Sequence, residues 1–287
     1  MDITGKTTLI GLLGRPVEHS ISPFMHNQAF HELGLPFAYL CFDCGEEELE
    51  EVVKGLKALG AKGWNCTMPN KVKMAQLVDV ISPAAKAIGA VNTVINENGT
   101  LIGHNTDGVG YMMAVKDAGY DVIGKKMTIF GTGGAAAAII AQAALDGVKE
   151  ISIFCRSSSR YMEATKKMVH MLLEETHCNI KIFDYDEDII RREMNNSYLV
   201  VNGTSVGMEP NIEKSVIPDS TYFNNKMVVS DIIYHPNETK FLKLAKEAGC
   251  ETFNGLYMLL YQGAEAFRLW TGKEMPVEKI KQLYFEN

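Results

Sequence analysis

Ile129-Phe-Gly-Thr-Gly-Gly-Ala-Ala136, near the middle of the chain, is the segment most indicative of the fold class. It joins residues 126–131, an apolar run typical of a β-strand, to residues 135–145, an alanine-rich run typical of a helix. Glycines at such a turn let the backbone approach a pyrophosphate without a Cβ clash, and the helix start binds its charge. The stretch therefore predicts a dinucleotide-binding turn made by Gly131, Thr132, Gly133, Gly134 and Ala135. The alternative is a tight turn that holds no ligand.

Strand-like and helix-like runs alternate along the chain, which is typical of α/β proteins. Strands are expected at residues 7–14, 37–44, 63–67, 91–96, 100–104, 126–131, 150–155, 179–183, 198–202, 227–231 and 251–253, with a hairpin turn at 97–99. Helices are expected at residues 23–33, 46–59, 70–78, 106–118, 135–145, 161–174, 186–194, 239–248 and 256–270. Because the glycine turn comes so late, the residues before it form a separate domain, and a Rossmann-like domain follows.

Length and composition narrow the class of protein. A chain of 287 residues suits two domains, and a net charge of −7 gives no general field that attracts nucleic acid or anionic lipid. No apolar run is long enough to cross a bilayer and no signal peptide is evident, so we expect a cytoplasmic protein. The six cysteines are scattered, and Cys41 and Cys44 fall on opposite faces of one expected strand. We therefore expect buried thiols rather than a metal or redox site.

The end of the second strand of the Rossmann-like domain bears on the choice of cofactor. An acidic residue there selects the ribose of NAD, whereas arginine suits the 2′-phosphate of NADP. Residues 154–160 hold no acid but two arginines and three serines, so we expect NADP to bind through Arg156 and Ser157. In the alternative, Arg156 stacks on the adenine while Ser157 and Ser158 cap the next helix, and NAD is the cofactor.

Four polar clusters each follow or end an expected strand of the first domain, where ligands bind in α/β sheets. They are Gly14-Arg-Pro-Val-Glu-His-Ser-Ile-Ser-Pro23, Asn65-Cys-Thr-Met-Pro-Asn-Lys71, Gly89-Ala-Val-Asn-Thr93 and Gly103-His-Asn-Thr-Asp-Gly108. Further distinctive strings follow at Asn202-Gly-Thr-Ser-Val-Gly-Met208, Asp231-Ile-Ile-Tyr-His-Pro236 and Gly255, and at Tyr261-Gln-Gly-Ala-Glu-Ala-Phe267.

In this order the strings resemble the shikimate dehydrogenase family over nearly the whole chain. Residues 68–71 and 269–273 look most like its quinate/shikimate dehydrogenase subgroup. The resemblance implies an α/β fold of two domains with a cleft between them. Residues 1–106 and 257–287 would form a substrate-binding catalytic domain with a mixed sheet, and residues 107–256 a Rossmann NAD(P)-binding domain.

The resemblance also implies roles for single residues. Ser20 and Ser22 would bind the substrate carboxylate. Ring hydroxyls would be bound by Asn65, Thr67, Asn92 and Gln262, and Tyr234 would touch the substrate. The nicotinamide side would be formed by Thr204, Met208, Ile233 and Gly255. Lys71 and Asp107 would form the catalytic pair.

The chemistry of a ketone reduction agrees with that pair. Hydride transfer builds negative charge on the carbonyl oxygen, and a lysine can both stabilise this charge and supply a proton. We therefore expect Lys71 to act as general acid/base, with Asp107 orienting it. Taken singly, these residues have structural interpretations: Lys71 as a surface charge, Asp107 as a helix cap, and Ser22 as the cap before Pro23.

The reaction expected is the reversible, NAD(P)H-dependent reduction of 3-dehydroshikimate to shikimate in aromatic amino acid (chorismate) biosynthesis, with quinate as a second substrate. The alternatives are a dedicated quinate dehydrogenase or a non-catalytic homologue that senses shikimate or nucleotide. We expect a small-molecule substrate, no nucleic-acid or membrane partner, no metal, and a monomer or homodimer. Ser157-Ser158 departs from the subgroup, which often has an acid here, and this leaves the choice between NADP and NAD open.

Overall fold

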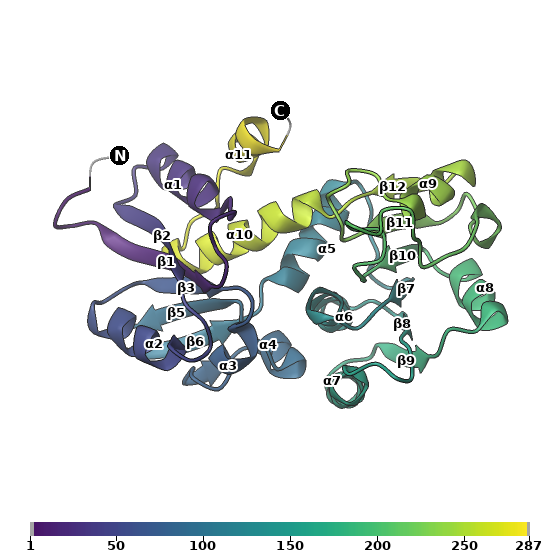
Figure 1. Cartoon of the computed structure of the whole chain (residues 1–287), viewed down its shortest axis with the longest axis horizontal. Coiled ribbons are helices and arrows are strands. Elements are labelled where there is room, and N and C mark those ends of the chain that lie inside the picture. Colours follow the sequence, from purple (N-terminus) through teal and green to yellow (C-terminus); the bar gives the residue numbers. More distant parts are fainter. Residues whose placement is uncertain (1–2, 286–287) are drawn as a thin grey trace. The chain divides into compact units, whose positions relative to one another are not determined.

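The computed structural model describes residues 3–285 and divides into two compact units. Unit 1 comprises Met1–Gly110 and Leu260–Asn287, and unit 2 comprises Tyr111–Leu259. The chain passes from unit 1 into unit 2 within helix α5 (Asp107–Asp117) and returns within α10 (Leu256–Thr271), as Figure 1 shows. The expected domain boundaries lie at the starts of these two helices, whereas the units divide inside them.

Unit 1 is built on a mixed six-stranded sheet in the order β2-β1-β3-β5-β6-β4. Its strands are β1 (Thr8–Gly14), β2 (Phe37–Asp43), β3 (Gly63–Cys66), β4 (Val80–Ile81), β5 (Thr93–Glu97) and β6 (Thr100–His104). Strand β5 runs antiparallel to both of its neighbours, and the other pairs are parallel. The expected hairpin is present, because Asn98 and Gly99 adopt φ values of 53° and 92°, as a two-residue type I′ turn requires.

Helices cover both faces of this sheet. One face packs against α2 (Leu49–Ala58), α3 (Lys71–Met74) and α4 (Pro83–Ile88) around the buried Trp64. On the other face lie α1 (Ser22–Glu32), the last part of α10, and α11 (Val277–Tyr284). Gly263 lets α10 approach α1, since a Cβ there would lie 2.1 Å from Met25 Cε. Trp270 Nε1 donates a hydrogen bond of 2.9 Å to the Val94 carbonyl and so ties α10 to the sheet.

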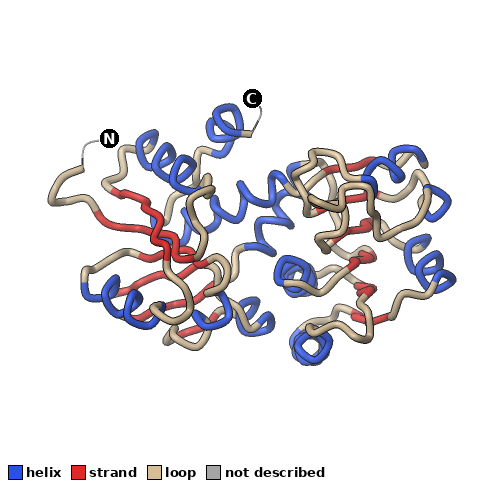
Figure 2. The backbone as a smooth tube through the Cα atoms, in the orientation of Figure 1, coloured by secondary structure: helices blue, strands red, loops and turns tan. Residues whose placement is uncertain are grey.

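Unit 2 has a parallel six-stranded sheet in the order β12-β11-β10-β7-β8-β9. Counted from β7, this is the strand order of the Rossmann fold, with its reversal between β7 and β10. The strands are β7 (Lys126–Phe130), β8 (Glu150–Phe154), β9 (Asn179–Phe183), β10 (Leu199–Asn202), β11 (Val228–Asp231) and β12 (Glu251–Phe253). Figure 2 shows helices on both sides: α6 (Gly134–Asp146) and α7 (Met162–Glu175) on one, α8 (Glu187–Asn195) and α9 (Lys240–Glu247) on the other.

Short elements depart from the sequence-based expectations. The helix expected to reach residue 78 ends at Met74, because the chain then leaves the helix to pair with β6 through Asp79, whose carboxylate accepts the Leu101 N–H at 2.8 Å. Strand β4, helices α4 and α11, and a 3₁₀ turn at Ser220–Tyr222 were not expected. For α4 the signal was in the sequence: Ser82 caps the helix, Pro83 begins it and Gly89 ends it at φ 71°.

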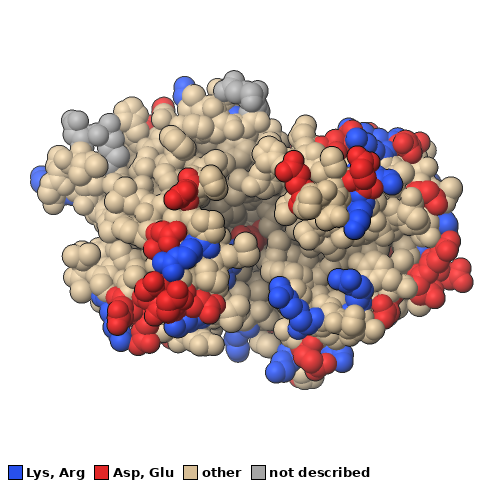
Figure 3. Space-filling model, viewed as in Figure 1, with Lys and Arg blue, Asp and Glu red and all other residues tan. Residues whose placement is uncertain are grey.

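The cysteines and the surface charges can be compared with the expectations from composition. All six cysteines are free thiols, and five are buried, but Cys41 is only partly buried because β2 is an edge strand, so its expected burial was wrong. Acidic and basic side chains are interspersed on the face seen in Figure 3. Within residues 3–285, none of the helices combines the length and the apolar character needed to span a membrane.

Candidate active site

Lys71 and Asp107 meet in unit 1. Lys71 Nζ lies 2.6 Å from Asp107 Oδ2, and the two side chains remain 30% and 15% exposed. Lys71 is the first residue of α3 and Asp107 the first residue of α5. The turn before Lys71 is held by the buried Asn70, whose Nδ2 donates to the Cys44 carbonyl at 3.0 Å. The pair is therefore fixed by two helix starts and is still open to a ligand.

Asn92 fixes the other oxygen of the Asp107 carboxylate. Its Nδ2 donates to Asp107 Oδ1 at 2.8 Å, while its Oδ1 accepts the Thr106 N–H at 2.8 Å and the Thr93 hydroxyl at 2.9 Å. A backbone N–H can only donate, so Thr106 determines which end of the Asn92 amide faces Asp107. Asp107 thus receives one donor on each oxygen, which orients it toward Lys71.

Asn65 continues this network away from the ion pair. Its Nδ2 donates to the Thr93 hydroxyl at 2.9 Å and to the Asn92 carbonyl at 3.1 Å, and its Oδ1 accepts the Tyr39 hydroxyl at 2.8 Å. Burial raises the pKa of Tyr39 well above its ordinary value, so the phenol stays protonated and donates. Both N–H donors of Asn65 are used inside the protein, so only the second lone pair of Oδ1 could accept a hydrogen bond from a ligand.

Three residues of this network were not assigned a role from the sequence. Thr93 and Thr106 lie inside polar clusters that were recognised, so their position was a usable signal. Tyr39 gave none, because it sits in an apolar strand where a tyrosine is ordinary. Its role follows only from the register that pairs β2 with β1 and β1 with β3.

The remaining predicted substrate residues of unit 1 are partly exposed: Ser20, Ser22, Thr67 and Gln262. The structure contradicts the interpretation of Ser22 as the cap of α1. The helix begins at Ser22 itself, and it is Ser20 Oγ that accepts the Ser22 N–H at 3.2 Å. Thr67 packs its methyl group against Gly14, where a Cβ would lie only 2.2 Å away. Tyr234 belongs to unit 2, on the loop after β11, and is exposed.

The glycine turn of unit 2 leaves the start of α6 open. Gly131 has φ +100° and faces Thr204, whose Cγ2 would lie 2.6 Å from a Cβ at this position. A Cβ on Gly133 or Gly134 would meet nothing within 4 Å, and no side chain caps the start of α6. The open N–H groups at this helix start therefore suit an anion. Thr132 is buried, with its hydroxyl 3.1 Å from Cys155 Sγ, and Ala135 follows in the first turn.

A buried carboxylate organises the loops after β10 and β11. Asp231 accepts the Asn202 side-chain amide at 3.0 Å, the Thr239 hydroxyl at 2.7 Å and the Ile233 N–H at 3.0 Å. Burial raises the pKa of Asp231 to about 6. Asn202 Oδ1 in turn accepts the Thr204 hydroxyl at 2.7 Å. This carboxylate, not assigned from the sequence, holds Thr204 and Ile233 in place.

The other two residues expected at the nicotinamide differ in their surroundings. Gly255 is required by packing, since a Cβ there would lie 1.9 Å from the Ile232 carbonyl oxygen. Met208 is 47% exposed and lies in the long loop after β10.

The loop after β8 carries Arg156 and Ser157, both exposed. The backbone N–H of Ser157 donates to Asp184 Oδ2 at 3.3 Å. Asp184 follows β9, the neighbouring strand, and was not expected here because it lies 27 residues away in the sequence.

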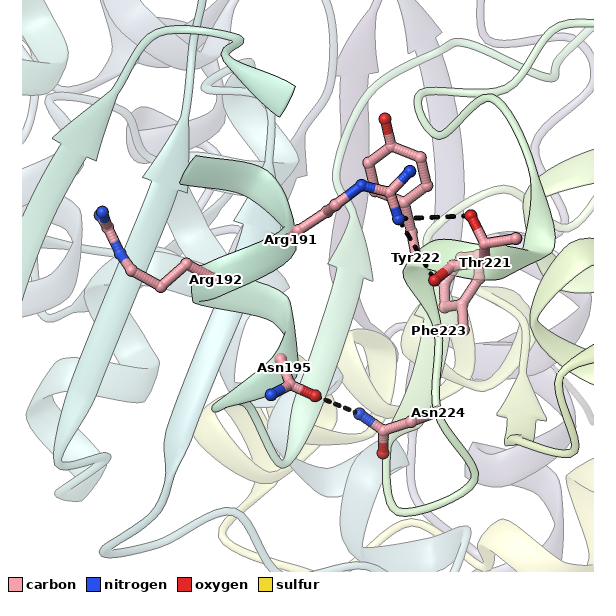
Figure 4. Close-up of a pocket in the computed structure, with 7 residues that line it drawn as sticks. All are labelled: Arg191, Arg192, Asn195, Thr221, Tyr222, Phe223 and Asn224. Carbon is pink, nitrogen blue, oxygen red and sulfur yellow. Dashed lines mark hydrogen bonds between the residues drawn. The ribbon is translucent and has the colours of Figure 1, made fainter. Parts of the chain in front are cut away.

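The structure also has a pocket of about 350 Å³ (Figure 4), lined by Arg191, Arg192, Asn195, Thr221, Tyr222, Phe223 and Asn224. Its polar groups largely bind one another: Arg191 lies 3.6 Å from the centre of the Tyr222 ring, and Asn224 donates to Asn195. It lies where chains enter β10 and β11, whereas ligands of parallel sheets bind at the carboxyl ends. We do not place the active site there.

Comparison with known proteins identifies the family. The sequence model of the shikimate dehydrogenase substrate-binding domain matches residues 12–94, and that of the shikimate 5′-dehydrogenase C-terminal domain matches residues 255–283. A protein named shikimate dehydrogenase (NADP(+)) from Listeria innocua is 51% identical over 99% of this chain and 97% of its own length. The chain belongs to the shikimate dehydrogenase family.

Solved structures of family members agree with this fold. A crystal structure of shikimate 5-dehydrogenase from Listeria monocytogenes, in complex with shikimate and NAD, has a TM-score of 0.96 at 50% identity and 99% coverage of both chains. A shikimate dehydrogenase structure in complex with NADP⁺ has a TM-score of 0.84 at 40% identity, covering 98% of this chain and 96% of the other. The expected α/β fold with one mixed and one Rossmann-like sheet is confirmed.

Proposed function

We propose that this chain is a shikimate dehydrogenase that catalyses the reversible reduction of 3-dehydroshikimate to shikimate with NADP(H), and that it also accepts NAD(H). The observation that carries the proposal is the ion pair of Lys71 and Asp107, 2.6 Å apart and partly exposed in unit 1. The name of the Listeria innocua relative, which is 51% identical, supports the same reaction.

In this reaction the bound nicotinamide supplies or takes the hydride. The ammonium of Lys71 stabilises the negative charge that develops on the substrate oxygen and gives it a proton. Asp107 uses one of the three ammonium donors, which leaves two for the substrate. Asn92 holds Asp107 from its other oxygen, so the carboxylate keeps its direction while the proton moves.

We assign substrate binding to unit 1. The hydroxyls of Ser20 and Ser22 would bind the carboxylate. Ring hydroxyls would contact Thr67, Gln262, the second lone pair of Asn65 Oδ1 and the second amide hydrogen of Asn92. Tyr234, on the loop after β11 in unit 2, stays a predicted substrate contact.

We assign dinucleotide binding to unit 2. The open helix start at Gly131–Ala135 fits a pyrophosphate, and Thr204, Met208, Ile233 and Gly255 would form the nicotinamide side. Arg156 and Ser157 would bind the 2′-phosphate of NADP. A role in chorismate biosynthesis, a cytoplasmic location and a monomeric or homodimeric state stay predictions.

A four-way kinetic experiment tests the proposal: shikimate and quinate, each with NADP⁺ and NAD⁺. We expect the highest kcat/KM for shikimate with NADP⁺. A preference for quinate would support the dedicated quinate dehydrogenase instead. Binding of shikimate without turnover of either substrate would contradict the enzyme assignment and favour a sensing homologue.

A further inference from the structure

We propose that Asp184, at the carboxyl end of β9, tunes cofactor choice by competing with the 2′-phosphate of NADP for the loop after β8, and so keeps NAD a usable cofactor. It depends on one part of the proposed function, which is that a dinucleotide binds with its adenosine beside β8.

The sheet brings this carboxylate to the loop after β8. Strands β8 and β9 are parallel, with Phe154 opposite Phe183, and the Cys155 N–H donates to the Phe183 carbonyl at 3.0 Å. The two chains therefore leave the sheet side by side. At this point the Ser157 N–H reaches Asp184 Oδ2 at 3.3 Å.

The loop after β8 already binds one anionic group, the carboxylate of Asp184. Asp184 Oδ1 also accepts the Tyr185 N–H at 2.8 Å, and these hydrogen bonds from Tyr185 and Ser157 lower the pKa of Asp184. The side chain is exposed and charged at neutral pH. A 2′-phosphate binding here would have to take the Ser157 amide from Asp184, or accept a second negative charge beside it.

Arg156, in contrast to Asp184, favours binding of the 2′-phosphate. Its guanidinium is exposed and, among residues 3–285, forms no ion pair, whereas Arg160 donates to the Tyr161 hydroxyl at 2.5 Å. Arg156 therefore favours a phosphate, while Asp184 can accept a hydrogen bond from the free 2′-hydroxyl of NAD. In Rossmann sites the acid that binds this hydroxyl usually ends the second strand. Here the third strand supplies it.

The test compares Asp184→Asn with Asp188→Asn, which removes the same charge from α8 nearby. Asparagine is isosteric and can still accept the Ser157 N–H. The probes are 2′,5′-ADP and ADP, which differ by the 2′-phosphate, with affinities measured by calorimetry. We expect D184N to bind 2′,5′-ADP about fivefold to tenfold more tightly with ADP affinity not increased, and D188N to change neither. The ratio of kcat/KM for NADP⁺ over NAD⁺ should rise in parallel.

Equal changes for both probes, no change, or the same change in D188N would overturn the proposal. Asp184→Ser, which also removes the charge, provides a second variant if D184N does not fold. Because fragment binding needs no turnover of shikimate, the result can be read even if the proposed reaction fails.

Discussion

At the scale of single residues, the direction of hydrogen bonds decides what the site can do. The Thr106 N–H forces the Asn92 amide to donate to Asp107, and Lys71 donates to the other oxygen. One donor on each oxygen holds the Asp107 carboxylate in the direction in which it orients the ammonium.

Asn92→Asp tests this polarity. The new carboxylate would keep the Thr106 N–H but would place a second negative oxygen about where Nδ2 now lies, 2.8 Å from Asp107 Oδ1. Two carboxylates so close share a proton. We expect kcat for shikimate oxidation at pH 7 to fall by about a hundredfold, with dinucleotide affinity within about twofold of wild type. An unchanged kcat would contradict the assigned polarity.

At the scale of elements, turns whose conformation depends on neighbouring residues could be predicted from the sequence. Asn98 and Gly99 determine a hairpin, and Gly131–Gly134 determine a strand–turn–helix, so both were evident in the sequence. The early end of the helix at Met74 could not be predicted, because it depends on Asp79 pairing with Leu101 in another strand.

The candidate site divides in the same way. Lys71, Asn92 and Asp107 lie in distinctive polar strings. Tyr39 contacts Asn65 and Asp184 contacts Ser157 only because particular strands become neighbours, and neither residue stands out locally.

The glycine turn offers a matched pair of variants. Gly131→Ala would force φ +100° on alanine and bring its Cβ 2.6 Å from Thr204, so we expect unit 2 to lose about 1–3 kcal/mol of stability. Gly133→Ala has φ −67° and open space, so its stability should change by less than about 0.5 kcal/mol. Both should weaken NADP⁺ binding. Thermal melts measure the stability of both variants, and calorimetry measures their affinity for NADP⁺. NADP⁺ binding by Gly133→Ala as strong as that of wild type would contradict the assignment of this turn to the cofactor site.

At the scale of the whole molecule, buried titratable groups set the pH dependence of stability. His26 is fully buried, stacked on the Tyr39 ring at 4.5 Å, and neither ring nitrogen has a hydrogen-bond partner among the described residues. Burial lowers its pKa to about 3. Between pH 6.5 and 3 the unfolded chain binds a proton at this position and the native protein does not, so stability falls as the pH falls.

His26→Phe should remove this dependence. Between pH 7 and pH 5, unit 1 of the wild type should lose about 2 kcal/mol more than the variant. Urea unfolding at both pH values, with a probe in unit 1, measures the difference. Parallel losses in the two proteins would show that His26 is protonated in the native state.

In the proposed reaction the Lys71–Asp107 pair performs the acid–base chemistry of shikimate oxidation. The most direct measurement compares kcat for shikimate with NADP⁺ in wild type and Lys71→Ala, with NADP⁺ affinity measured in parallel. We predict that kcat falls by about a hundredfold or more while NADP⁺ affinity stays nearly unchanged. A wild-type kcat in Lys71→Ala would contradict the claim.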